Sequence, residues 1–346
     1  MTGFLRRMLR KLGGQMVRDS VVLFFGWFRF RKTGVTPQSA HHALVLLFCQ
    51  TGGTSNDLLH RFIARRRPPR QIDAQGVLGN LSTRQLDEIT NALRDRGYYV
   101  FEQRLPPALC DRLLEFALAE KAVVKIDRQP VLEQYDRRHP RGVRYDFTEE
   151  AILRNDAAQQ LMADRSVLAV AQAYLGCLPI LDLIACWWHT SWSQQPDKDA
   201  AQFFHFDMDR IKWLKFFFYA TDVGTDNGPH TFVAGSHRTH GIPSSILQKG
   251  QVRIDDEEVL RSYASADLIE FCGPRGTIIA EDTRGLHKGK HVRAGDRLVF
   301  QLEFSDSLFG ADYPDPTSGY VPGPALKEMA TAHPDVYSRF VPAGGS

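Results

Sequence analysis

The sequence lacks an apolar run long enough to cross a membrane. The apolar stretch at residues 21–28 falls well short of the roughly 20 residues that a spanning helix needs. Arg29, Arg31 and Lys32 follow it at once, and no small-residue cleavage site is present, which argues against a secretory signal. We therefore expect a cytoplasmic protein whose contact with a membrane, where there is one, is peripheral.

Cysteine is scarce as well, with five residues in 346 and no Cys-x-x-Cys pair. An odd number without that spacing is neither a disulfide framework nor a zinc site, and it fits a reducing compartment. Cys186 and Cys272 stand in apolar surroundings, which predicts small core residues. The chain also lacks a glycine-rich phosphate loop, and its basic residues are not interleaved with an aromatic stacking platform, so we expect no nucleic-acid partner.

Positive charge is concentrated at the start of the chain. Residues 1–70 hold thirteen Lys and Arg against two Asp, whereas the whole chain has a net charge of +3. Within residues 1–35, apolar residues recur at helical spacing: Leu5, Met8, Leu9, Leu12 and Met16. A basic amphipathic helix of this kind is typical of contact with a membrane surface. Two alternatives stay open, namely a helix packed on the protein's own body and a mitochondrial presequence.

Helical patterns dominate the first half of the chain and strand patterns the second. We expect helices within residues 40–65, 82–97, 106–123 and 151–175, and a polar loop over the site mouth at residues 127–147. We expect strands at residues 98–101, 179–188, 213–219, 231–233, 268–271, 277–280 and 297–304. Helices gathered ahead of many short strands predict a mainly β fold with flanking α-helices, around a double-stranded β-helix core of the jelly-roll, cupin-like type.

Three regions follow from these patterns. Residues 1–70 form a basic, helical N-terminal arm, residues 80–310 the main domain, and residues 311–346 a Pro-rich tail draped on the surface. The run Arg65 to Arg70, which contains Pro68 and Pro69, is the expected linker between arm and domain.

The segment His205-Phe206-Asp207 is the candidate for chemistry. Residues two apart in a strand point to the same side, so an imidazole nitrogen and a carboxylate oxygen would face one metal ion. His287 can supply the second imidazole of a two-His, one-carboxylate iron site, which leaves three coordination positions open. Arg297 follows ten residues later at the start of an apolar run, where its fork of donors can hold a dicarboxylate.

This order of residues resembles the phytanoyl-CoA dioxygenase family of Fe(II)/2-oxoglutarate oxygenases. Residues 226–238, DNGPHTFVAGSHR, resemble the family's "NGP…PGSH" segment, with Ala234 where Pro is usual. Residues 82–105 resemble its opening helix and "GY-V" strand, so the resemblance covers roughly residues 80–310. The separation between His287 and Arg297 is one residue shorter than usual in the family, which implies a deletion in the turn between them.

The resemblance implies Fe(II), 2-oxoglutarate and O2 as cofactor and cosubstrates. His205, Asp207 and His287 would be the metal ligands, and Arg297 would hold the far carboxylate of 2-oxoglutarate. It implies hydroxylation of a small or lipid-like organic molecule with release of succinate and CO2, because halogenating relatives carry Gly or Ala in place of the Asp. The alternatives are a catalytically silent jelly-roll binding module and a peripheral membrane oxygenase.

Several other residues compete for a place in the site. Tyr219 and Gln301 are candidates for cosubstrate binding, and Trp188 and Trp213 for the cavity wall. His189 is a candidate pocket-wall residue. The rivals of His287 are His230, which we assign to a loop, and His237, His240 and His291. The rival of Arg297 is Arg293, which precedes an expected turn and should be exposed.

Overall fold

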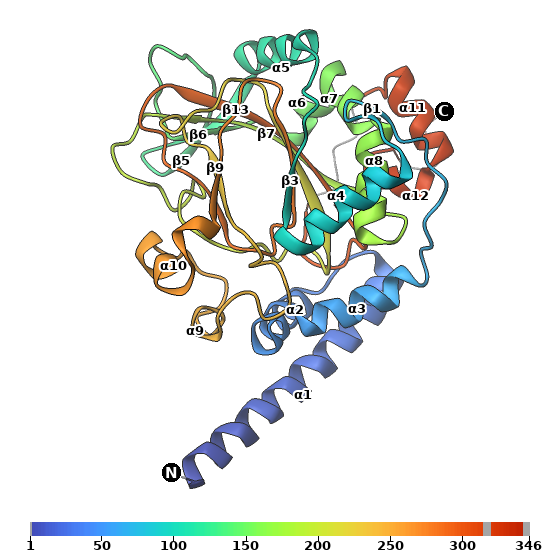
Figure 1. Ribbon diagram of the computed structural model, residues 1–346, viewed down its shortest axis with the longest axis vertical. Coiled ribbons are helices and arrows are strands. Elements are labelled where there is room, and N and C mark those ends of the chain that lie inside the picture. Colours follow the sequence, from blue (N-terminus) through green and yellow to red (C-terminus); the bar gives the residue numbers. More distant parts are fainter. Residues whose placement is uncertain (1, 314–319, 342–346) are drawn as a thin grey trace.

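The computed structural model describes residues 2–313 and 320–341, with the backbone alone for residues 2–12. Its centre is a pair of antiparallel sheets (Figure 1). The larger has eight strands in the order β3-β11-β8-β13-β7-β6-β4-β5, and the smaller has the order β10-β9-β12. Aromatic and aliphatic residues of both sheets pack into one apolar cluster between them. The expected jelly-roll core with flanking helices is confirmed.

The strands of the second half lie within one or two residues of the expected positions, except β12, where no strand was expected. The strands of the larger sheet are β3 (Tyr98–Val100), β4 (Lys121–Ile126), β5 (Gln129–Gln134), β6 (Arg144–Asp146), β7 (Ile180–Thr190), β8 (Trp213–Tyr219), β11 (Ile278–Glu281) and β13 (Asp296–Ser305). Those of the smaller sheet are β9 (His230–Val233), β10 (Leu268–Phe271) and β12 (His287–Gly289), and a separate hairpin joins β1 (Gln75–Gly76) to β2 (Gly79–Asn80).

Side chains of the central strands alternate between two environments, except at Leu181, beyond a register shift in β7, and at Trp213, at the start of β8. On β7, β8, β11 and β13 the even-numbered residues, such as Trp188, Phe216 and Phe300, belong to the large core under the helices. The odd-numbered residues, such as Trp187, Phe217 and Val299, face the smaller sheet. This follows from the two-residue period of a strand. The odd-numbered face is therefore the one of the two that can contribute side chains to an interior site between the sheets.

Helices cover the outer face of the larger sheet. They contribute Leu93, Leu113, Leu161, Leu168 and Tyr337, among others, to its core. These helices are α4 (Thr83–Arg96), α5 (Pro107–Ala119), α6 (Glu149–Leu153), α7 (Asp156–Met162), α8 (Arg165–Leu175), α11 (Pro324–Ala332) and α12 (Pro334–Tyr337). The Ser82–Gln85 capping box begins α4 and Gly97, at φ 90°, ends it, as the sequence predicts.

The N-terminal helices pack at one end of the two sheets, the lower end in Figure 1. They are α1 (Thr2–Thr33), α2 (Gln38–Thr51) and α3 (Thr54–Ala64), and α1 projects beyond the body (Figure 1). Leu23, Leu44 and Phe48 share a core with Phe206 and Trp213 of the main domain. Packing on the body, one of the alternatives for residues 1–35, thus holds for the second half of α1, and α2 packs there as well. The short helices α9 (Ser244–Leu247), α10 (Asp256–Ser262) and η1 (Ser265–Asp267) connect β9 to β10.

Five expectations need correction. The helix expected to reach residue 123 ends at Ala119, and residues 121–146 form β4, β5 and β6 where a loop over the site was expected. Residues 151–175 are three helices, because Asn155 and Asp164 cap new ones. The C-terminal region contains α11 and α12, which reach the core with Leu326 and Tyr337. Cys272 is exposed, whereas Cys186 is buried as expected.

A helix that crosses a bilayer has to be both long and apolar. None of the helices that the structure describes meets both requirements. The arm expectations that concern the side chains of Leu5, Met8, Leu9 and Leu12 lie outside the described residues.

Candidate metal centre

Three predicted ligands meet at the edge of the smaller sheet. His287 begins β12, and His205 pairs with it across an isolated antiparallel bridge, with N–O distances of 3.0 and 2.8 Å. The backbone amide of Asp207 donates to the carbonyl of Thr283 at 2.9 Å, which positions Asp207 next to this bridge. One ligand atom from each of the three side chains lies within 4.8 Å of the others. The backbone thus brings together residues that are 80 positions apart.

Backbone carbonyls fix both imidazole rings in the same way. Nδ1 of His205 lies 2.9 Å from the Phe203 oxygen, and Nδ1 of His287 lies 3.0 Å from the Gly285 oxygen. A carbonyl only accepts, so in the neutral ring each Nδ1 carries the proton and each Nε2 has a free lone pair. The two Nε2 atoms lie 3.7 and 3.4 Å from the Asp207 oxygens. Ligand histidines are commonly oriented by such a contact on the other ring nitrogen.

Burial and neighbouring charge set the ionisation of the three groups. Burial holds the pKa of His205 well below its usual range, with the His287 charge adding to this effect. Burial also opposes the protonated form of His287, but the Asp207 carboxylate outweighs it and raises that pKa. Burial would raise the pKa of Asp207, yet Lys215 and His287 hold it well below its usual range. The carboxylate is therefore ionised and available to a cation.

Lys215 is the fixed positive charge behind Asp207. Its Nζ lies 2.7 Å from Asp207, 2.9 Å from Asp209 and 3.2 Å from Glu303. Strand register explains the arrangement, because Lys215 on β8 is paired with Glu281 on β11 and with Glu303 on β13. All three are odd-numbered and point inward. Lys215 orients one oxygen of Asp207, which leaves the other for a metal ion.

A cavity of about 250 Å³ lies between the sheets beside these ligands. It is enclosed by residues from the inward faces of β7, β8 and β13, by the three ligands and by Arg144 of β6. The inward-facing residues are Leu183, Ala185, Trp187, His189, Lys215, Phe217, Arg297 and Gln301. A second hollow of about 230 Å³, lined by Gln251, Val252 and Arg253, reaches His205 and Asp207 from another side.

Arg297 places an uncompensated positive charge in this cavity. Its side chain is 1% exposed, it donates to the Gly228 carbonyl, and Nη2 lies 2.7 Å from Nδ1 of His189. Among the described residues no carboxylate forms an ion pair with it, and its Nε has no partner there. Nε2 of His189 is also without a partner among them. Burial and then the Arg297 charge hold the pKa of His189 well below its usual range, so the ring is neutral. Because Nδ1 faces an Arg297 donor, the hydrogen of the ring is on Nε2.

Two unpartnered donors and a buried charge at one place suit an anionic group. A buried guanidinium without a carboxylate is costly, and an anion that enters the cavity would relieve that cost. The predicted position of Arg297 on a core strand, pointing inward, agrees with the structure. Arg293 is exposed, as expected.

No protein-family model matches the chain, and no curated protein matches it by sequence. Several solved structures have a related arrangement. EctD from S. alaskensis with bound Fe is 18% identical over 75% of this chain and 92% of its own, with a TM-score of 0.48. The epimerase SnoN, in complex with Fe3+, alpha ketoglutarate and nogalamycin RO, is 17% identical over 70% of this chain and 94% of its own, with a TM-score of 0.47. AviO1 from Streptomyces viridochromogenes Tue57 is 16% identical over 68% of this chain and all of its own, at 0.42.

These neighbours include iron-bound and 2-oxoglutarate-bound proteins, by their descriptions. At these identities and scores, the chemistry of the present site has to be inferred from its own residues.

The remaining candidates differ in whether they reach the cavity. Gln301 lines the cavity. Tyr219 does not, because its hydroxyl donates to the Phe271 carbonyl at 3.0 Å and accepts from the His230 amide. Trp188 and Trp213 were expected on the wall, and this is wrong: their indole nitrogens donate to Ala117 and Thr283 outside the cavity. Trp187, the odd-numbered neighbour, is on the wall instead.

His189 is confirmed as a pocket-wall residue, whereas His230 is not a loop residue. His230 begins β9, lines the cavity and lies 2.9 Å from Glu281, and its ring centroid is 5.5 Å from that of His287. Burial raises the pKa of Glu281 to about 8. Sequence reasoning missed Glu281 and Lys215, although a charged residue inside an apolar strand was a usable signal. His237 lies outside the cavity, where Nε2 lies 3.2 Å from the Arg94 carbonyl.

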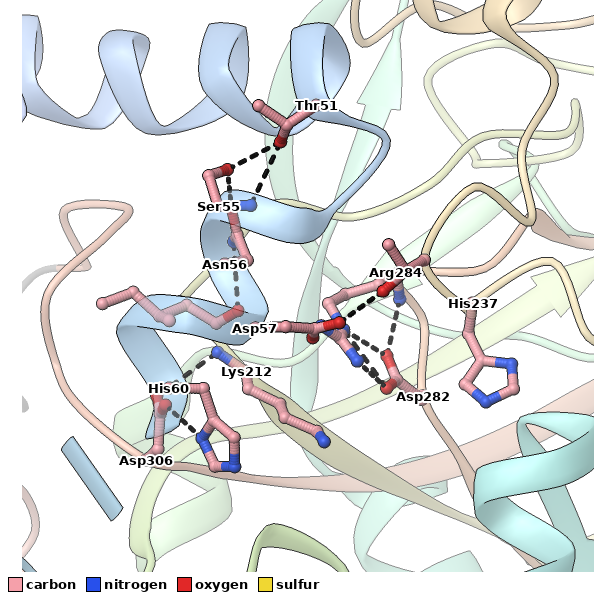
Figure 2. Close-up of polar contacts among 12 residues, drawn as sticks. Thr51, Ser55, Asn56, Asp57, His60, Lys212, His237, Asp282, Arg284 and Asp306 are labelled. Atoms are coloured by element: carbon pink, nitrogen blue, oxygen red, sulfur yellow. Dashed lines mark hydrogen bonds and ion pairs between the residues drawn. The ribbon is translucent and has the colours of Figure 1, made fainter. Parts of the chain in front are cut away.

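Helix α3 is joined by polar contacts to the segments that carry the ligands (Figure 2). Asp57 lies 3.1 Å from Arg284, which in turn pairs with Asp282 at 2.7 Å at the start of the turn that leads to His287. Nδ2 of Asn56 donates to the carbonyl of Ile211 at 3.1 Å. The N-terminal helices therefore contact the same turns that position the metal ligands.

A ring contact from α2 reaches the ligand segment itself. Phe48 stacks on Phe206, which stands between His205 and Asp207, with ring centroids 5.5 Å apart and an interplanar angle of 30°. Phe206 is fully buried, because the alternation of the strand turns it away from the cavity and toward the N-terminal helices. The two ligands thus share a backbone that is packed from behind by α2.

Proposed function

We propose that this protein is an Fe(II)- and 2-oxoglutarate-dependent dioxygenase of the phytanoyl-CoA dioxygenase type, and that it hydroxylates a small or lipid-like organic substrate. The observation that carries the proposal is a single cavity that holds both a two-His, one-carboxylate cluster and a buried Arg297 with no ion pair to a carboxylate of the described residues. A His and carboxylate cluster alone could be a polar contact, and a buried arginine alone could serve packing. Together they provide for a metal ion and for a bidentate organic anion that lies beside it.

The residues present fit the metal and the cosubstrate. Two free Nε2 lone pairs and an ionised carboxylate on one side of a cavity are the donor set of non-heme Fe(II) oxygenases. Arg297 and Nε2 of His189 would hold the far carboxylate of 2-oxoglutarate. When bound, iron(II) with 2-oxoglutarate and O2 supplies the oxidising power for hydroxylation, with release of succinate and CO2.

The chain's own residues orient the candidate ligands, keep Asp207 ionised and exclude water from the cavity. The carbonyls of Phe203 and Gly285 keep both imidazoles in the metal-binding tautomer. Lys215 keeps Asp207 ionised and in place. Trp187 and Phe217, on the cavity wall, exclude water from the region where a reactive species would be formed. The retention of Asp207, in place of a small residue, favours hydroxylation over halogenation.

A metal titration tests the ligand assignment. The protein should bind one Fe(II) per chain, and anaerobic calorimetry should show that Asp207→Ala or His205→Ala lowers the affinity sharply. His139→Ala is the control, since this histidine is exposed and its ion pair is with the neighbouring Asp136, and it should bind iron normally. Normal iron binding by both ligand variants would rule out the assignment.

Turnover distinguishes the enzyme from a silent binding module. With Fe(II), 2-oxoglutarate and O2, a library of small and lipid-like organic molecules should contain some that stimulate succinate release above the uncoupled background. The Asp207→Ala variant should give none of this stimulation with the same compounds. A protein that binds Fe(II) and 2-oxoglutarate but consumes neither 2-oxoglutarate nor O2 under any of these conditions would favour the binding module.

A further inference from the structure

Helix α1 has two apolar faces, and only one of them is covered. Leu23 and Gly26 are buried against the body, where a Cβ on Gly26 would clash with Ala40 of α2. The half-buried residue Trp27 packs on Phe309, with ring centroids 5.3 Å apart. These contacts fix the rotation of the helix about its axis, and therefore also fix which residues point away from the body.

The outward face is apolar. Four of its residues are spaced four, three and four positions apart, namely Val17, Val21, Phe24 and Phe28, and Phe25 lies beside them. Their side chains are 49 to 67% exposed. At 3.6 residues per turn this spacing forms one continuous stripe on the side opposite Leu23 and Gly26. Three exposed phenylalanines on one helix face are unusual for a surface that only meets water. We call these five residues the outer stripe.

The charge around the outer stripe is entirely positive. Arg18, Arg29, Arg31 and Lys32 are exposed, and none forms an ion pair with a described residue. The single acidic residue between positions 13 and 33 is Asp19, which is buried on the other side and accepts from Gln15 and Gln50. The helix therefore presents apolar and cationic groups outward, with no exposed acidic group among the side chains described.

We propose that the outer stripe of α1 is a docking surface for an anionic lipid bilayer. Phenylalanine rings would enter the boundary between headgroups and acyl chains, while the four cations would meet anionic headgroups. A second copy of the chain fits less well, because pairing two outer stripes would bring unpaired arginines together. The face differs from the one that the sequence pattern indicated: Met16 is half-buried and packs toward the body.

The proposal is independent of catalysis, so it is tested by binding. Full-length protein should co-sediment with vesicles of equal parts phosphatidylcholine and phosphatidylglycerol, much less with phosphatidylcholine alone, and less at high salt. The double variant Phe24→Ser with Phe28→Ser should weaken partitioning on the order of a hundredfold, because each ring loses its burial in the membrane. Arg18→Gln with Arg29→Gln should reduce binding to the anionic vesicles alone.

The matched control is Leu132→Ser, which removes an exposed apolar side chain of β5 that is 56% accessible, similar to the 58% of Phe24 and Phe28. It should leave vesicle binding unchanged. Since all these residues are exposed, thermal unfolding of each variant should match that of the parent protein. Equal vesicle binding by the parent and the phenylalanine variant would overturn the proposal. It would also be overturned by a lipid-free dimer, seen in sedimentation velocity, that the phenylalanine variant converts to monomer while no variant affects vesicle binding.

Discussion

Replacing Arg297 by Lys separates charge from geometry in the proposed cosubstrate site. Both side chains are cations, but only the guanidinium presents a planar fork to a carboxylate. In the structure, Nη1 of Arg297 donates to the Gly228 carbonyl and Nη2 contacts Nδ1 of His189. Its Nε has no partner among the described residues. A lysine would keep the charge and a single contact, so 2-oxoglutarate should bind more weakly while the metal ligands stay unchanged.

The size of the effect depends on how many charged hydrogen bonds each substitution removes. A hydrogen bond to a charged group contributes about 1.5–3 kcal/mol, so removing one arm of the fork should weaken 2-oxoglutarate binding about 10- to 150-fold. Removing one partner of a buried ion pair costs about 3–5 kcal/mol, so Arg297→Ala should weaken it by about two to four orders of magnitude. Because Arg297 is 1% exposed, little solvent screening reduces these figures.

Anaerobic calorimetry of 2-oxoglutarate binding to the Fe(II)-loaded protein measures this directly. Iron affinity, measured separately, should be near normal in both Arg297 variants, and thermal unfolding shows whether they fold. Arg293→Ala is the matched control, since this arginine is exposed and its contact with Asp226 uses the backbone amide. If Arg293→Ala weakens 2-oxoglutarate binding and Arg297→Ala does not, the assignment of the cosubstrate site is mistaken.

Two further predictions concern stability and the coupling of α3 to the metal site. Burial raises the pKa of Glu281 from 4.5 to about 8, so its contribution to stability is complete below about pH 4.5 and is lost as the pH rises through 8. In the metal-free protein, Glu281→Gln should therefore gain stability relative to the parent between pH 5 and pH 9, by on the order of 4 kcal/mol, in urea unfolding; a constant difference would contradict this. Asp57→Asn should lower stability by about 1–3 kcal/mol and weaken iron binding, because Arg284 loses a charged partner beside the turn to His287. Asp335→Asn, which breaks a half-exposed pair with Arg70, should cost under about 1 kcal/mol and leave iron binding unchanged.

The second half of the fold was predictable because burial on both faces leaves a clear signal. The strands β7, β8 and β13 are nearly all buried and read as long apolar runs. Two of the three candidate ligands were predictable for a local reason, since His205 and Asp207 are two residues apart and need no knowledge of register. His287 joins them only through its backbone bridge to His205. Arg297 followed from its place at the start of such a run.

What the sequence did not indicate depends on contacts between distant segments. Strand β5 is largely exposed, so it lacks the alternation of a half-buried strand. It pairs with β4, which in turn pairs with the edge of β6. Lys215 and Glu281 are 66 positions apart and become partners only through the register of β8 and β11. His230 looked like a loop residue because its neighbours Gly228 and Pro229 are typical of turns.

The composition of the N-terminal region wrongly suggests that it is structurally separate from the main domain. Its basic character and the Arg65–Arg70 run suggested an arm that could be removed, yet α2 and α3 contact the turns around the metal ligands through Phe48 and Asp57. Deleting residues 1–70 should therefore disturb the proposed membrane binding and the proposed iron binding together. Substitutions in the outer stripe leave those inner contacts in place, because the two faces of α1 are opposite. A deletion that abolished both vesicle binding and iron binding would not separate the two proposals. If the Phe24 and Phe28 variant loses vesicle binding but keeps its iron affinity, the outer stripe serves membrane binding and the inner contacts of the N-terminal helices support the metal site.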